Sequence, residues 1–160
     1  MRGHDIGAVL LIALSMVVAA CSGAGDTSDM VARDRSEDEA AIRELLVANE
    51  AATNRHDSTG VAATYTSEGD VWIVGYPRLS GLDEIRRNEE EFYSTPGFQE
   101  WRTTIDAIRF ISRDAAIVET TDLTILDTGE LAAQTTWIVS RNNGKWRFVA
   151  VRVMSFDEQP

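Results

Sequence analysis

The feature that most limits how this chain can fold is a change of hydrophobic period after Pro96-Gly97. Beyond that point apolar residues alternate with polar ones, which is typical of half-buried strands. Four strands are predicted, at residues 101–111, 115–126, 131–140 and 146–154. The short sequences DTG and NNG lie between the later strands, and such tight turns join antiparallel neighbours. The second half of the chain is therefore predicted to form an antiparallel sheet.

The part of the chain before this change is predicted to be mainly helical. Apolar residues recur at helical spacing in residues 36–54, where Ser36 and Glu39 match a capping box. Asp57 can cap a second, short helix. The β-branched and aromatic residues 71–74 predict a strand. Helices that come first and strands that come later indicate a segregated α+β fold.

A third helix is predicted after Ser80, which repeats the capping pattern with Asp83. Ile85 and Phe92 fall on one apolar face of this helix. The acidic run at residues 89–91 is assigned to the solvated face.

The composition is that of one globular domain with an acidic surface. The 160 residues include 15 Lys+Arg and 26 Asp+Glu, which gives a net charge of −11. With 44% hydrophobic residues the chain can bury a core, and the composition disfavours global disorder. An acidic surface repels phosphate backbones, and no nucleic-acid partner is expected.

The N-terminus is typical of an exported protein. Residues 6–20 are almost wholly apolar and end in small residues before Cys21, the only cysteine. The stretch is shorter than the roughly 20 residues that cross a bilayer, and it fits the apolar region of an export signal. A lone cysteine cannot form an internal disulfide, so in an exported chain it needs another role.

The string VAAC, followed by Ser22-Gly23, resembles the lipobox of bacterial lipoproteins. The resemblance implies cleavage before Cys21, attachment of diacylglycerol to its sulfur and acylation of the new N-terminus, for example with palmitate. The protein would then be anchored by lipid to a membrane of the bacterial cell envelope. Residues 1–20 are the expected signal peptide, 21–35 the lipidated cysteine with a flexible tether, and 36–157 the domain. The alternative is an ordinary secretory signal with an incidental cysteine.

Three local strings, in their order and spacing, carry a family resemblance: ATNRHD, SGLDEI and NGKWRFVAV. Together with the order of elements they resemble the nuclear transport factor 2-like superfamily, and within it the SnoaL-like domains. The resemblance covers residues 36–156. It implies an α+β fold in which a strongly curved antiparallel sheet wraps around N-terminal helices, a cone-shaped, cystatin-like roll with a pocket at its open end.

Ketosteroid isomerase is the best-understood catalyst of that superfamily. The resemblance places its catalytic tyrosine, its aspartate base and its protonated aspartate at Asn49, Ile73 and Thr136 of this chain. Isoleucine cannot abstract a proton, so this isomerisation is not expected. Asn49 and Thr136 can still donate hydrogen bonds to a ligand.

If Thr136 faces the pocket, Gln134 faces it too, because successive strand side chains alternate. The same register turns Glu119 and Thr121 of the preceding strand inward. Glu119 is then the candidate general base, since desolvation raises the pKa of a buried carboxyl group. In the alternative, Glu119 lies on the outer face, because a shift of one residue exchanges the two faces of a strand.

Three aromatic residues, Tyr65, Trp72 and Trp101, are candidates for the lining of the pocket mouth, with the hydrophobic core as the alternative. His56 is the only histidine after the export signal, which leaves too few nitrogen and sulfur ligands for a metal site. No nucleotide, flavin or phosphate-loop motif occurs, so neither a metal nor a cofactor is expected.

The last predicted strand is apolar on both faces, with Phe148 on one and Val151 on the other. A sheet that packs one face on helices normally exposes the other face to water, so a partner is expected to cover the outer face. The family resemblance implies a homodimer formed through this sheet, with Trp137 in the same patch.

Two classes of function remain open. In the first, the domain binds a small apolar or amphipathic molecule, or a protein partner, at the cell envelope. In the second, it is an enzyme of the isomerase, cyclase or hydratase type that uses Glu119 as its base. The first is favoured because the matched catalytic positions are lost.

Overall fold

The computed structural model describes residues 35–155 of the chain, and the predicted signal peptide, Cys21 and most of the tether lie outside them. The elements follow the predicted order of helices first and long strands later. They are α2 (Arg35–Asn54), α3 (Ser58–Ala63), β1 (Tyr65–Ile73), β2 (Leu79–Ser80), α4 (Leu82–Tyr93), β3 (Phe98–Ser112), β4 (Ala115–Leu126), β5 (Gly129–Asn142) and β6 (Lys145–Ser155). The predicted α+β class is confirmed.

All six strands form one sheet, in the order β2-β1-β6-β5-β4-β3. The strands from β3 to β6 are antiparallel, as their tight turns predict. β1 departs from the antiparallel expectation, because it pairs with β6 in the parallel direction. Turns fix the direction of strands that are consecutive in the chain, whereas β1 and β6 are far apart in sequence and meet only in the folded sheet.

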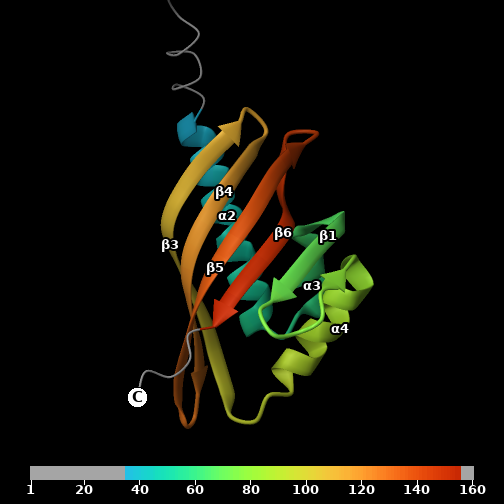
Figure 1. Ribbon diagram of the computed structural model, residues 1–160, viewed down its shortest axis with the longest axis vertical. Coiled ribbons are helices and arrows are strands. Elements are labelled where there is room, and N and C mark those ends of the chain that lie inside the picture. Colours follow the sequence, from blue (N-terminus) through green and yellow to red (C-terminus); the bar gives the residue numbers. More distant parts are fainter. Residues whose placement is uncertain (1–34, 156–160) are drawn as a thin grey trace, which may run out of the picture.

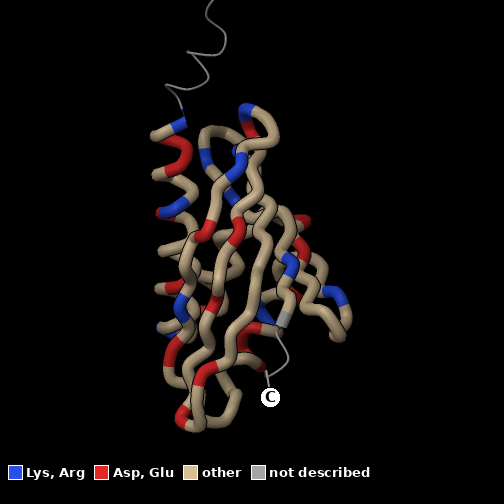
Figure 2. Tube along the Cα trace, turned by 60° about the vertical axis from the view of Figure 1, so that its left-hand side comes forward, with Lys and Arg blue, Asp and Glu red and all other residues tan. Residues whose placement is uncertain are grey.

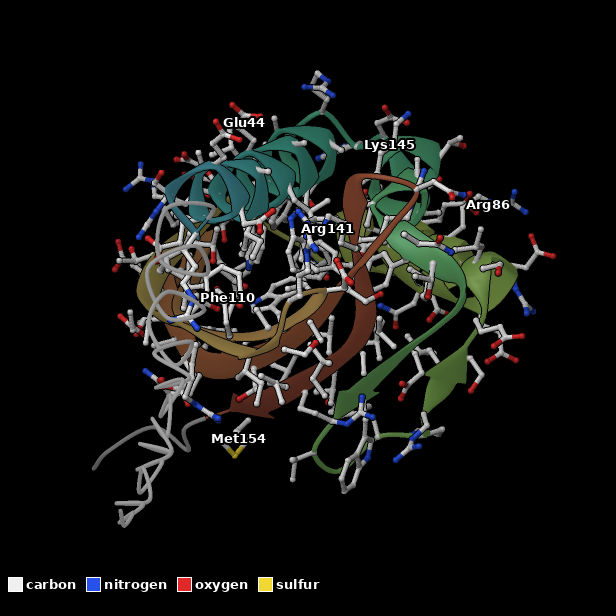
Figure 3. All side chains as sticks on the ribbon, turned by 90° about the horizontal axis from the view of Figure 1, so that it is seen from above. Glu44, Arg86, Phe110, Arg141, Lys145 and Met154 are labelled. Carbon is white, nitrogen blue, oxygen red and sulfur yellow. The ribbon has the colours of Figure 1, made fainter. Side chains whose placement is uncertain are left out.

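The sheet curves around α2, which crosses its inner face, while α3 and α4 lie beside β1 (Figure 1). Seen from above, Phe110 and Arg141 point into the space between α2 and the sheet, and Glu44 and Met154 point outward on opposite sides (Figure 3). β-Bulges interrupt the pairing of β3 with β4, and such bulges bend a strand and increase its twist. The curvature leaves room for a core between helix and sheet, in which Ile42 and Phe148 are fully buried.

Two local predictions at turns hold. The Asp57 carboxylate accepts a hydrogen bond of 2.8 Å from the Gly60 amide and so caps α3. In the β5–β6 turn, Asn143 and Gly144 both have positive φ, at 51° and 74°. This is the conformation that a tight hairpin requires and that Asn-Gly adopts at low cost.

The two predicted capping boxes are wrong. α2 begins at Arg35, so Ser36 lies inside the helix and does not precede it. α4 has Gly81 as its N-cap, with φ 80° and no capping side chain. The Gly81 amide donates to the Gly69 carbonyl at 2.8 Å, so the backbone of β1 fixes the start of α4 and a serine cap is not needed.

Helix α2 covers the free edge of β3 with polar side chains. The Asn54 side chain donates to the Trp101 carbonyl and accepts from the Trp101 amide, both at 2.8 Å. The Glu50 carboxylate accepts from the Thr103 amide at 2.9 Å. These bonds satisfy backbone groups that an edge strand would otherwise leave unpaired. They also fix the position of Trp101 relative to α2.

The faces of the last strands differ from the predicted ones. Trp137 and Phe148 pack against each other inside the core, with ring centroids 4.5 Å apart, and neither belongs to an outer patch. The register between β5 and β6 shifts after Phe148, so that Val151 faces inward as well. The bulge breaks the strict alternation on which the prediction rested.

In residues 35–155, no helix is long and apolar enough to cross a membrane. The same residues contain no group of three or more side chains arranged to hold a metal ion.

Candidate functional site

A cavity of about 250 Å³ lies between the inner face of the sheet, the end of α2 and the side of α4. Pockets for drug-sized ligands occupy roughly 300–1,000 Å³, so this one suits a smaller molecule. Its wall is formed by Asn49, Thr53, Tyr65, Val71, Ile73, Asn88, Glu89, Phe92, Trp101, Asp122, Thr124, Ala133, Trp137, Val151 and Val153. The wall is mostly apolar and aromatic, and a few polar groups converge within it.

Asp122 lies on the cavity wall in β4 and is only 5% exposed. One of its carboxylate oxygens accepts hydrogen bonds from the hydroxyl groups of Thr103 at 2.6 Å and Thr120 at 2.9 Å. The Trp137 indole donates to the same Thr120 hydroxyl at 2.9 Å and so extends the network to β5. Burial raises the pKa of Asp122, although the hydroxyl groups bonded to it oppose the increase.

Glu89 lines the same cavity from α4. It follows Ile85 by four residues and precedes Phe92 by three, which places all three on the inward face of α4. Burial raises the pKa of Glu89 to about 7, and the hydroxyl group of Tyr93 offsets part of this increase. The carboxyl group therefore changes its protonation near neutral pH.

Tyr65 lies on the cavity wall at the start of β1, near both acids. Burial raises the pKa of its phenol, and the nearby charges of Glu89 and Asp122 raise it further, so the hydroxyl group stays protonated. Gly69 makes room for the ring, because a β-carbon there would lie 3.1 Å from the Tyr65 side chain. A neutral phenol near two carboxyl groups can donate a hydrogen bond to a ligand or to an ionised neighbour.

Asn49 is held at the back of the cavity by the turn that precedes β1. Its side-chain amide donates to the Thr64 hydroxyl at 2.9 Å, and that hydroxyl donates to the Val61 carbonyl at 2.6 Å. Asn49 is 3% exposed, so its orientation is fixed by these contacts rather than by water. Its second amide hydrogen and its oxygen remain as polar groups of the wall.

Of the residues proposed from sequence as ligand contacts, the structure brings three to the cavity: Asn49, Tyr65 and Trp101. Ile73, which the family resemblance matched to a catalytic base, also lines it. Whether these residues bind a ligand stays a prediction.

The predicted inward orientation of Thr121, Gln134, Thr136 and Glu119 is wrong. The buried residues of β4 include Val118 and Thr120, so the residues between them point to the outer face. Glu119 is exposed, and Gln134 donates to the Thr121 hydroxyl at 2.8 Å away from the cavity. The predicted set of inward-facing residues is shifted by one residue relative to the observed set, and such a shift exchanges the two faces of a strand.

Trp72 also lies away from the cavity. It is 40% exposed, on the face of β1 opposite to Val71, and the Arg78 guanidinium lies 5.8 Å from its ring centroid. Alternation along β1 therefore separates it from the aromatic residues that line the cavity.

Sequence reasoning missed the two acids of the cavity. Asp122 follows the buried Val118 and Thr120 at a spacing of two, a signal that was visible once the register was known. Glu89 lies on the apolar stripe of its helix, but the neighbouring Glu90 and Glu91 made it look like part of a solvated acidic face.

Neither a known family profile nor a curated protein matches the sequence. Solved structures do match. A ketosteroid isomerase-like protein from Erwinia carotovora atroseptica is 24% identical and aligns with a TM-score of 0.65 over 74% of this chain and 95% of its own. An NTF2-like protein of unknown function from Shewanella oneidensis is 21% identical, with a TM-score of 0.65 over 72% of this chain and 98% of its own.

The fold is that of the nuclear transport factor 2-like proteins. A cystatin-like fold protein of this kind from Novosphingobium aromaticivorans is 18% identical and covers 86% of this chain and 94% of its own, with a TM-score of 0.64. The fold predicted from the sequence is thus confirmed. In this fold the cavity is lined by the strands of the sheet and by the side of α4.

Proposed function

We propose that this domain binds a small amphipathic molecule in the cavity between the sheet and α4. The observation that carries the proposal is the combination of a mostly apolar wall with three convergent polar groups, Tyr65, Glu89 and Asp122. An apolar wall supplies affinity through burial, and a few fixed polar groups orient the ligand.

Buried polar groups support a binding function for a second reason. An acid that is desolvated without a cationic partner costs free energy, and a core built for stability alone would place apolar side chains there. Glu89 and Asp122 both have raised pKa values because of burial. A bound molecule that interacts with them recovers part of that cost.

The binding proposal can be tested by NMR with a panel of one-ring and two-ring compounds that are neutral, cationic or anionic. We expect some compounds to shift the amide signals of Tyr65, Trp101 and Asp122, and the Glu89→Gln variant to change their affinities. Glu91→Gln is a matched control, because Glu91 is an exposed residue of the same helix. A panel in which no compound perturbs the cavity would refute the proposal.

A second candidate function is proton transfer on the bound molecule, with Glu89 in place of Glu119 as the base. The favouring observation is the Glu89 pKa of about 7, because a general base works best when its pKa is near the working pH. Tyr65 and the protonated form of Asp122 could stabilise the negative charge that develops on the substrate. One solved structure with this fold is called ketosteroid isomerase-like. Turnover of a bound carbonyl compound, abolished in Glu89→Gln with binding retained, would establish this function.

We also propose that the domain is anchored at the cell envelope as a lipoprotein. This second proposal rests on the VAAC string, which ends in the only cysteine, and on the apolar residues 6–20. Cys21→Ala is expected to release the protein from the membrane fraction and to block lipid-dependent cleavage of the signal. Normal processing and membrane retention of the variant would contradict the anchor.

A homodimer through the outer face of the sheet also stays a proposal, with residues other than Trp137. Ile117, Ile138 and Ala150 form an apolar row across β4, β5 and β6 on that face. Sedimentation of the wild type is expected to show a dimer, and Ile138→Glu a monomer. A wild-type monomer at all concentrations would refute it.

A further inference from the structure

The side chains on the cavity wall that can be charged near neutral pH are all acids. Among the fifteen lining residues there is no Lys, Arg or His, whereas Glu89 lines the cavity from α4 and Asp122 from β4. Both carboxyl groups lie close enough to Tyr65 to raise the pKa of its phenol. The cavity therefore combines negative charge with the absence of a cationic partner among its own residues.

The same wall carries four aromatic rings from four different elements. Tyr65 comes from β1, Phe92 from α4, Trp101 from β3 and Trp137 from β5. The two tryptophan rings lie with their centroids 6.3 Å apart and are tilted by 58° relative to each other. Rings that surround a space from several sides can direct their electron-rich faces toward a cation, and tryptophan does so most strongly.

We propose that the molecule bound in this cavity is a small organic cation, an amine or a quaternary ammonium compound, held by the aromatic rings and by the carboxylates of Glu89 and Asp122. This inference rests on the proposed binding function and names its ligand class. The volume of about 250 Å³ limits the ligand to a compact molecule.

The charge of the whole protein favours the same ligand class. The chain carries a net charge of −11, which attracts cations and repels anions during encounter. Asp122, Thr124 and Ala133 lie in the half of the β4–β5 hairpin that ends at its turn, with Asp127 in the turn and Glu130 just after it. In Figure 2 acidic residues (red) gather at this end of the sheet, while basic residues (blue) gather around the β3–β4 and β5–β6 turns at the other end.

Other ligand classes fit the wall less well. An anion would meet two acids and no compensating side chain. A neutral molecule would leave the carboxyl groups desolvated without a countercharge, which is the state that raises their pKa values. A cation compensates the charge and also uses the ring faces.

Binding of a cation should strengthen as Glu89 ionises. The titratable groups near its carboxyl group are Tyr65 from β1 and Tyr93 from its own helix. The His56 ring stacks on Tyr93 with centroids 4.8 Å apart, and Asp122 lines the same cavity from β4. Burial raises the pKa of Glu89 to about 7. The affinity for a permanently charged cation is therefore expected to rise between about pH 6 and about pH 8.

The experiment compares three probes of nearly equal shape by titration calorimetry of the purified chain. Choline is cationic, 3,3-dimethylbutan-1-ol replaces its nitrogen with carbon, and 3,3-dimethylbutanoate is anionic. At about pH 8 we expect choline to bind about tenfold or more tightly than the neutral alcohol, and the anion not to bind. Equal or tighter binding of the alcohol or the anion would overturn the cation inference while leaving the binding function intact. Absence of binding by all three probes, and by the NMR panel, would overturn both.

Variants show whether the preference comes from this cavity. Glu89→Gln and Trp101→Leu are each expected to reduce the preference for choline over the alcohol at least about fivefold. Glu91→Gln and Trp72→Leu are the matched controls, because both residues are exposed and lie outside the cavity. If Trp101→Leu fails to fold, Glu89→Gln alone decides the question. A choline preference that survives Glu89→Gln unchanged would refute the assignment.

Discussion

Replacing Glu89 by glutamine is expected to stabilise the protein, and by an amount that depends on pH. The pKa of the carboxyl group rises from its ordinary value of 4.5 to about 7 in the folded protein, because burial disfavours its charged form. Each pH unit of difference corresponds to about 1.4 kcal/mol. Ionised Glu89 therefore lowers the free energy of unfolding by about 3 kcal/mol, and glutamine has no charge to bury.

The sign follows from proton binding in the two states. Between pH 4.5 and about 7 the folded protein holds a proton on Glu89 that the unfolded chain has released. The unfolding free energy contributed by this group therefore falls as pH rises through that range. The cost is absent below pH 4.5 and complete above about pH 7, so the advantage of Glu89→Gln should grow across this window.

Urea denaturation of the wild type and the variant, from about pH 4 to about pH 8.5, measures the difference directly. Subtracting the wild-type curve from the variant curve removes the contribution of groups that titrate in the same way in both proteins. Glu91→Gln should show no such dependence, because Glu91 is exposed. A difference between Glu89→Gln and wild type that is constant across this pH range would refute the assignment of Glu89 to a desolvated wall.

Three further substitutions test how the scaffold holds the cavity, each measured by urea denaturation. Asp57→Ala removes the cap on the Gly60 amide and should cost about 1 kcal/mol, whereas Asp57→Asn should cost less. Asn54→Ala removes both hydrogen bonds to the Trp101 backbone and should cost about 1–3 kcal/mol, with a change in Trp101 fluorescence that a purely global effect would not give. Phe148→Ala empties a fully buried site and should cost about 3–5 kcal/mol.

The order and type of the elements could be predicted because local chemistry determines them. The Asn143-Gly144 turn, for example, needs positive φ at both positions, which this dipeptide adopts readily. The start of α4 could not be predicted in this way. Gly81 is positioned by the Gly69 carbonyl of a distant strand, and no pattern within the helix sequence reports that contact.

The face of each strand was harder to predict than its existence. Residues 119–122 read Glu-Thr-Thr-Asp, so polar residues occupy both alternating sets, and hydrophobicity does not choose between them. The choice is made by tertiary contacts, above all the hydrogen bond from Trp137 to Thr120 inside the core. The bulge after Phe148 adds a second change of face that strict alternation cannot anticipate.

Stability and binding are linked through Glu89. A cost of about 3 kcal/mol is a large fraction of the roughly 5–15 kcal/mol that stabilises a typical domain, so a carboxylate on this wall is poorly explained as a structural element. In the proposed complex a cation beside Glu89 lowers its pKa back toward the ordinary value and returns that free energy. Up to about 3 kcal/mol then becomes available to binding, which corresponds to an affinity gain of about a hundredfold. The Glu89→Gln variant should therefore be more stable than the wild type and bind the cation more weakly. A variant that is more stable but binds the cation as tightly would support the desolvation argument and contradict the ligand assignment. Weaker binding without a gain in stability would do the reverse.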